Sequence, residues 1–61
     1  MCYQVFYLAN GETRTYLSQP TTEAEAHRYS EAFDKKYYNK KMPGANRVYP
    51  YSRSWVGRAF H

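Results

Sequence analysis

The stretch from Thr22 to Lys41 most constrains the fold, because its pattern alone is long and periodic enough to predict a helix. Thr22 and Glu25 have the spacing of a capping box, in which each side chain hydrogen-bonds to a free backbone N–H of the first turn. Pro20 precedes the stretch and Pro43 follows it. Apolar residues recur at steps of three and four, the period of a helix face that packs on a core. They are Ala26, Tyr29, Phe33 and Tyr37. We therefore predict a helix over about residues 22–41.

The N-terminal part of the chain predicts a β-hairpin. Residues 2–9 and 12–18 are rich in aromatic and β-branched residues and are separated by Asn10-Gly11. Asn-Gly favours a two-residue type I′ turn, because both central positions need a positive φ. Such a turn places Ala9 opposite Glu12 and Phe6 opposite Thr15.

The period of two assigns the hairpin side chains to two faces. We expect the face with the purer aliphatic and Phe character to lie under the helix, and the tyrosine-rich face to be half exposed. The first face comprises Cys2, Phe6, Leu8 and Leu17, and the second comprises Tyr3, Val5, Tyr7 and Tyr16.

Residues 47–56 also alternate with a period of two, which indicates a third strand, and residues 57–61 form a short tail that Phe60 could anchor. Pro50 lacks a backbone donor, so this strand is expected at a sheet edge or interrupted there. The order hairpin, helix, strand predicts an α+β fold, with a three-stranded antiparallel sheet and the helix packed across one face. We expect one small domain over residues 1–61.

The composition limits what such a domain can do. A chain of 61 residues buries too little surface to enclose a catalytic cleft. Twelve residues are aromatic, eight of them Tyr, whereas Ile is absent and Leu occurs twice. Tyrosine must therefore supply much of the core, and the remaining rings suit contact sites.

The cysteine count and the N-terminus indicate the compartment. Cys2 is the single cysteine, so an internal disulfide is excluded. The sequence has no apolar run of membrane-spanning length and no signal-peptide pattern. We expect a complete small protein of the cytoplasm.

The charge is divided unequally along the chain. Residues 1–34 have a net charge of −3, whereas residues 35–61 contain seven cations and no acid, for a net charge of +7. Such a field attracts phosphate or an acidic protein surface. The alternative is that the cations serve only solubility.

Aromatic and cationic residues together suggest a binding platform. If the odd-numbered residues of the third strand face away from the helix, they join the tyrosine-rich face, where bases could stack and phosphates could meet arginine. The alternative is that these rings face the helix and form the core, and a one-residue shift of the strand would invert the assignment. The candidate binding residues of the platform are Tyr7, Arg14, Tyr16, Arg47, Tyr49, Tyr51, Arg53 and Trp55.

A lysine cluster at the end of the helix adds to the candidate site. Its members could bind phosphates as point charges. The alternative is an ordinary solvated last turn. The cluster comprises Lys35, Lys36, Lys40 and Lys41.

The sequence argues against an enzyme. His27 is four residues after Glu23, which predicts a surface pair rather than a metal site. Cys2 has no base at a recognisable spacing, and no glycine-rich phosphate loop is present. We therefore expect no catalytic residue, no metal and no cofactor.

Two hypotheses of function remain open. The first is a basic, tyrosine-rich module that binds nucleic acid, either single-stranded or through backbone contacts. The second is a small effector or inhibitor, of the kind encoded by phages and mobile elements, that docks on a larger protein in the host cytoplasm. Tyr, Trp and Arg dominate such interfaces. The exposed edge of a three-stranded sheet would also allow homo-oligomers.

Overall fold

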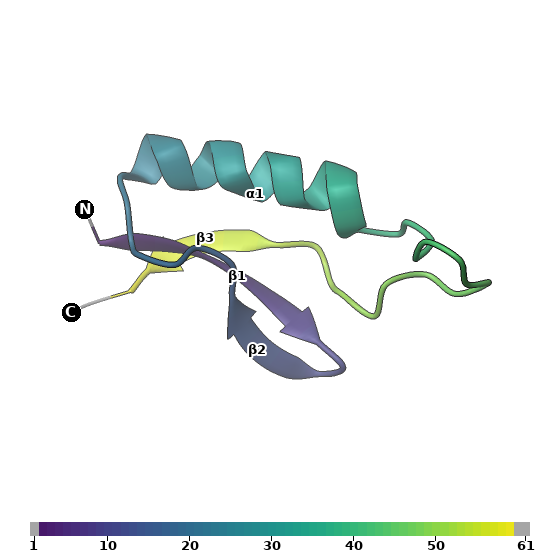
Figure 1. Ribbon diagram of the computed structural model, residues 1–61. Coiled ribbons are helices and arrows are strands. Elements are labelled where there is room, and N and C mark those ends of the chain that lie inside the picture. The colour runs from purple at the N-terminus through teal and green to yellow at the C-terminus, as the bar shows by residue number, and fades with distance from the viewer. Residues whose placement is uncertain (1, 60–61) are drawn as a thin grey trace.

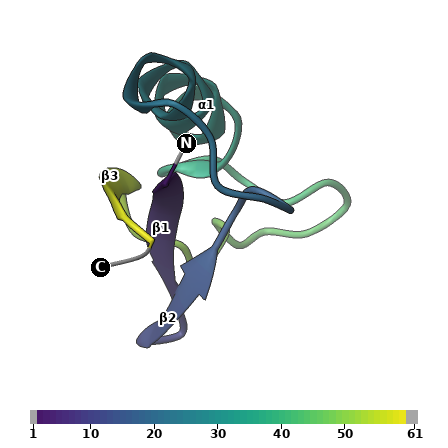
Figure 2. The same cartoon turned by 90° about the vertical axis from the view of Figure 1, so that its left-hand side faces the viewer.

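The computed structural model describes residues 2–59, and it has the predicted α+β architecture. Strand β1 (Tyr3–Ala9) lies between β2 (Glu12–Thr15) and β3 (Trp55–Arg58), and both pairings are antiparallel. Helix α1 (Glu23–Tyr37) covers one face of the sheet (Figure 1). In the view of Figure 2, the helix lies on the side of β1 and β3, and β2 is the strand farthest from it. The predicted position of the third strand at a sheet edge is confirmed.

The hairpin forms as its turn sequence predicts. Asn10 and Gly11 have φ angles of 54° and 85°, the positive values that a type I′ turn needs. The expected register is confirmed, with Ala9 opposite Glu12 and Phe6 opposite Thr15. The turn therefore determines which residues of β1 and β2 share a face.

Helix α1 starts as predicted but ends earlier. The Thr22 hydroxyl accepts from the Glu25 N–H at 3.2 Å and caps the first turn. The last helical residue is Tyr37, not Lys41, because Tyr38 is extended, with a ψ of 121°, and Asn39 then turns the backbone into the left-handed region with a φ of 56°. Lys40 and Lys41 consequently lie in the segment after the helix.

The core is centred on the helix residue Phe33, which is 1% exposed. The side chain of β1 residue Val5 is fully buried, and the Tyr7 ring lies 4.6 Å from the Phe33 ring. The prediction that the Phe6 and Leu8 face lies under the helix is therefore wrong. Both faces carry polar residues, but the tyrosine-rich face offers more ring surface to pack against Phe33, so its burial is favoured. Tyr29 also differs from the prediction: it is exposed, and the helix buries Ser30 instead.

The third strand begins later than predicted, because the chain bulges before it, and it ends at Arg58, so the predicted tail over residues 57–61 is wrong for its first two residues. Phe60, which was expected to anchor the tail, lies outside the described residues. Tyr51 is paired with Ala9 and Trp55 with Phe6, so three residues of this segment stand opposite two residues of β1. The extra residue is a β-bulge, which reverses the alternation of faces along a strand. Tyr51 points to the helix, whereas Trp55 lies on the opposite face of the sheet.

A hydrogen-bonded cluster holds the bulge against the helix. The Asp34 carboxylate accepts from the Ser54 N–H at 2.8 Å and from the Ser54 hydroxyl at 2.9 Å. The Ser30 and Ser54 hydroxyl oxygens are 2.6 Å apart, and both residues are buried. The chain therefore enters β3 at a position set by α1.

The Gln4 side chain substitutes for a backbone pair where β2 ends. Its amide oxygen accepts from the Leu17 N–H at 2.8 Å and from the Val5 N–H at 3.0 Å, and its amide nitrogen donates to the Leu17 carbonyl at 3.1 Å. Gln4 is 5% exposed, so these bonds are shielded from water. They fasten the chain that leads from the hairpin to the helix.

Replacing Gln4 by Leu removes these three hydrogen bonds. The Val5 N–H and the N–H and carbonyl of Leu17, which are shielded from water, then lose the Gln4 amide as a partner. We expect Gln4→Leu to lower the free energy of unfolding by about 2 kcal/mol in a urea titration. Gln19→Leu, at an exposed position, is the matched control. Equal midpoints for the two variants would contradict the role of the Gln4 amide.

Ser54→Ala tests the cluster that holds the bulge. We expect a loss of about 1 to 2 kcal/mol in the same titration, because the variant keeps the backbone bond to Asp34 but loses the buried hydroxyl. The exposed Ser18→Ala is the control. A Ser54→Ala protein as stable as the control would show that the hydroxyl contributes nothing to the position of β3.

Candidate nucleic-acid interface

Residues 40–49 form a hairpin-like projection that we call the basic finger. Met42 N–H donates to the Arg47 carbonyl at 2.8 Å, and Tyr49 N–H donates to the Lys40 carbonyl at 2.8 Å. Gly44, in the turn, has a φ of 72°. In Figure 1 the finger extends past the end of the helix, away from both chain ends. The sequence prediction of a continuous strand over residues 47–56 is therefore wrong, because this part of the chain pairs back on residues 40–42.

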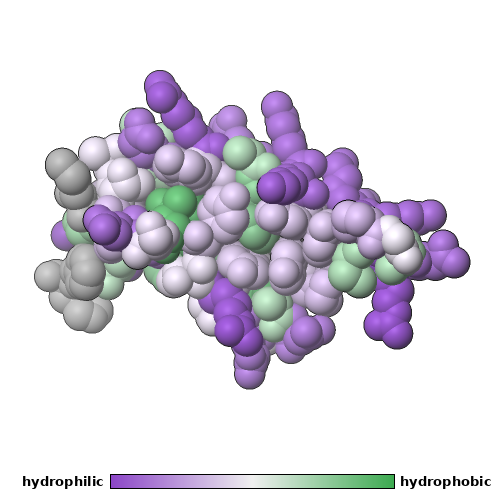
Figure 3. Space-filling view, in the orientation of Figure 1, coloured by the Kyte–Doolittle hydropathy of each residue, from purple (hydrophilic) through white to green (hydrophobic). Residues whose placement is uncertain are grey.

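Cations from three segments of the chain gather at this end of the molecule. The segments are the end of the helix, the basic finger and the stretch before β3. All of these cations are exposed, and within residues 2–59 none of them lies within 4.0 Å of a carboxylate oxygen. Figure 3 shows hydrophilic side chains projecting from this end of the molecule. We call this region the basic end. Its members are Lys35, Lys36, Lys40, Lys41, Arg47 and Arg53.

Two of these cations lie over tyrosine rings. The Lys36 ammonium is 5.3 Å from the centre of the Tyr37 ring, and the Arg53 guanidinium is 5.1 Å from the centre of the Tyr38 ring. Cation–π contacts of this kind restrict the side chains but leave them accessible to a phosphate. These cations consequently have a defined place at the basic end.

The tyrosines of the predicted platform take part in the core beneath the helix. The rings of Tyr16 and Tyr51 lie 5.0 and 5.8 Å from the Phe33 ring. The Tyr49 ring is stacked 5.5 Å from that of Tyr51. Tyr16 is 38% exposed, whereas Tyr49 and Tyr51 are half-buried. These rings therefore face the helix and form part of the core, which is the alternative stated in the sequence analysis.

Trp55 is separated from those tyrosines by the bulge. Its ring is stacked on Phe6, with ring centres 5.8 Å apart. The Phe6 ring covers Gly57, where a β-carbon would approach it to 3.1 Å. With Leu8, Phe6 and Trp55 form what we call the outer face, the side of the sheet away from the helix. The predicted platform is therefore not one surface but two.

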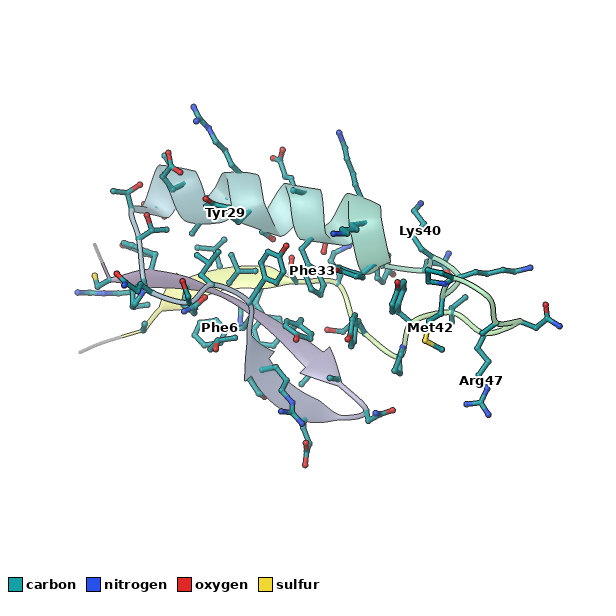
Figure 4. All side chains as sticks on the ribbon, in the orientation of Figure 1. Phe6, Tyr29, Phe33, Lys40, Met42 and Arg47 are labelled. Carbon is teal, nitrogen blue, oxygen red and sulfur yellow. The ribbon has the colours of Figure 1, made fainter. Side chains whose placement is uncertain are left out.

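A groove of about 450 Å³ separates the basic finger from the β1–β2 hairpin. One wall carries Met42, Tyr49 and Tyr51, and Arg14 and Ala9 are on the hairpin side. Figure 4 shows Met42 and Arg47 projecting from the finger on the side where the hairpin lies. The Arg14 guanidinium is 2.9 Å from the Glu12 carboxylate, and this pair is exposed. Of the predicted site residues, the structure thus brings Tyr7, Arg14, Tyr49 and Tyr51 together.

Sequence reasoning missed Met42 and Ala9 as residues of this groove. The hairpin register predicts Ala9 beside the turn, but which residues lie across the groove from Ala9 depends on how the basic finger folds. The one available signal was Pro43-Gly44 between two short polar segments, which is typical of a turn.

A second hollow, of about 680 Å³, lies between the segment after β2 and the first half of the helix. It is lined by Tyr16, Tyr29 and Pro20, and its charged residue is Glu25. The Glu25 carboxylate is 3.8 Å from Arg28. The hollow has no cation among its lining residues, whereas the smaller groove is lined by Arg14 as well as by the acid Glu12, so the smaller groove is the better candidate.

Over residues 2–59, no three His, Cys, Asp or Glu side chains are grouped as metal ligands. His27 lies 4.0 Å from Glu23, as expected for a surface pair. No helix in the described part of the chain is both long and apolar enough to span a membrane.

Comparison with known proteins adds no family assignment: no protein-family model, curated protein or solved structure matches this chain.

Proposed function

We propose that this protein is a small non-enzymatic binding module, and that its basic end binds the phosphates of nucleic acid. The observation that carries the proposal is the gathering of six exposed cations at one end of a molecule whose extents are 39 × 21 × 16 Å. Between residues 35 and 59 the chain has no acid. Asp34, the nearest acid in sequence, uses a carboxylate oxygen to accept from Ser54.

The residue types at the basic end favour phosphate over an acidic protein surface. Four of the six cations are lysines, which are depleted at protein interfaces but bind phosphates as point charges. The exposed Trp55 and Leu8, which would anchor a protein contact, lie instead on the outer face. An interface made mainly of exposed cations is typical of backbone binding, which neutralises phosphates and releases their counterions.

The finger lysines provide the test. We expect the double variant Lys40→Gln, Lys41→Gln to bind a labelled oligonucleotide about tenfold more weakly at 50 mM salt, because two phosphate contacts are lost. The slope of log affinity against log salt should fall by about two. Fluorescence anisotropy measures both quantities. Lys36 and Arg53 are left unchanged because their side chains lie on tyrosine rings.

The double variant Arg28→Gln, Arg58→Gln is the matched control, since it removes two exposed charges outside the basic end. It should bind nearly as the original protein does. An equal loss in both variants would mean that only net charge matters and would contradict a site. Displacement by polyglutamate as effective as by an oligonucleotide of equal charge would indicate an acidic protein partner instead.

The outer face supports a second candidate function, docking on a larger protein as an effector or inhibitor. Trp55 is 44% exposed and Leu8 is 37% exposed. The paired residues on this face are uncharged, from Gln4 at one end to Thr13 at the other. An exposed Trp within an uncharged patch is a frequent anchor of protein interfaces. This face lacks the cations that nucleic acid would need.

A charge placed on the outer face tests the second candidate. If an identified partner docks there, Leu8→Glu should weaken the complex at least tenfold in a calorimetric titration, because a carboxylate would be buried without a partner. Val48→Glu, at another exposed apolar position, on the basic finger, should leave that complex intact. A complex that tolerates Leu8→Glu but not Val48→Glu would rule out docking through the outer face.

A further inference from the structure

We infer that the groove between the basic finger and the β1–β2 hairpin receives an unpaired base, so that the ligand of this protein is single-stranded nucleic acid. The inference rests on the proposed function and names its substrate class. It follows from two features of the groove: its aromatic lining and the arginines that flank it.

The lining of the groove suits a flat aromatic ring. Tyr7, Tyr49 and Tyr51 contribute rings, and Met42 contributes a polarisable thioether. The Tyr7 and Tyr51 rings meet edge to face at 5.0 Å, and Tyr49 is held edge to face against Tyr37 at 4.9 Å. These contacts hold the rings in place before any ligand arrives. A base that stacks on them therefore binds without first ordering the site.

The charges around the groove suit the phosphates on either side of such a base. Arg14 lines the groove from β2 together with Glu12, whose carboxylate lies 2.9 Å from the Arg14 guanidinium and orients it. Arg47 projects from the finger on the same side as Met42 (Figure 4). Lys40 is paired through its carbonyl with Tyr49, but its side chain projects to the opposite side of the finger from Met42 and Arg47 (Figure 4). Cations on both sides of an aromatic groove are the arrangement that binds a single strand through stacking and backbone contacts together.

A duplex could not use this groove. Its bases are stacked and paired, so a duplex would present only phosphates to the protein and would reach only the cations. A strand with unpaired bases can turn one base into the groove, where ring stacking adds to phosphate binding. The larger hollow near Glu25 offers tyrosines as well, but it has no cation among its lining residues. The groove beside the basic finger has both tyrosine rings and a cation among its lining residues.

The test compares two single strands with equal numbers of phosphates, an oligothymidine and an abasic strand of the same length. We expect the oligothymidine to bind about tenfold more tightly in fluorescence anisotropy at 150 mM salt, because stacking is absent from the abasic strand. Ala9→Phe should abolish this difference by filling the groove, while leaving the affinity for the abasic strand and for a duplex unchanged. Ala24→Phe, on the exposed side of the helix, is the matched control.

A second variant guards against misfolding of the first. Tyr49→Leu removes a ring of the groove wall and should also bring the oligothymidine affinity down to that of the abasic strand. A melting curve for each variant shows that it is folded.

The outcomes separate the inference from the function on which it rests. Equal affinities of the original protein for the oligothymidine and the abasic strand, with strong salt dependence, would overturn the groove and leave phosphate binding in place. A folded Ala9→Phe protein that keeps the full preference would also overturn the groove. No binding of either strand or of the duplex at 50 mM salt would overturn the proposed function itself.

Discussion

The packing of tyrosine rings around Phe33 is the interaction on which the rest of the structure depends. Phe33 is 1% exposed, and its ring is within 6 Å of the rings of Tyr7, Tyr16, Tyr37 and Tyr51. These residues come from β1, the segment after β2, the helix and the segment before β3. With few aliphatic side chains available, ring-on-ring contacts must join all of these segments. The cluster therefore forms the core, and two of its members, Tyr7 and Tyr51, also line the groove beside the basic finger.

The bulge before β3 decides how the remaining aromatic residues are distributed. One extra residue between Tyr51 and Trp55 reverses the faces, so Tyr51 completes the core and Trp55 joins Phe6 on the outer face. The hydrogen bonds from Ser54 to Asp34 hold this arrangement against the helix. As a result, the molecule has two different surfaces, a cationic end beside an aromatic groove and an uncharged sheet face.

Much of the fold could be predicted because its signals are local. The Asn10-Gly11 turn set the hairpin register, and Thr22 marked the start of the helix. The face under the helix could not be predicted in the same way. Both faces of the hairpin are amphipathic, and the choice depends on how much ring surface Phe33 can bury, which is a property of the packed molecule.

The candidate site was predictable in its charges but not in its geometry. The sequence shows seven cations and no acid after residue 34, and the charge of a residue does not depend on where the fold places it. The groove has no such signature, since Tyr7 and Arg14 lie far in sequence from Met42 and Tyr49. Only the pairing of the finger with itself and of residues 50–52 with the end of β1 brings them together.

The sequence by itself determined the order of the elements, the hairpin register and the concentration of positive charge after residue 34, because each depends on near neighbours or on composition. The tertiary structure alone decided which sheet face is buried, where the third strand changes face and which rings meet across the groove. A bulge of one residue reverses the direction of every side chain beyond it, and no local pattern in residues 47–56 indicates the bulge.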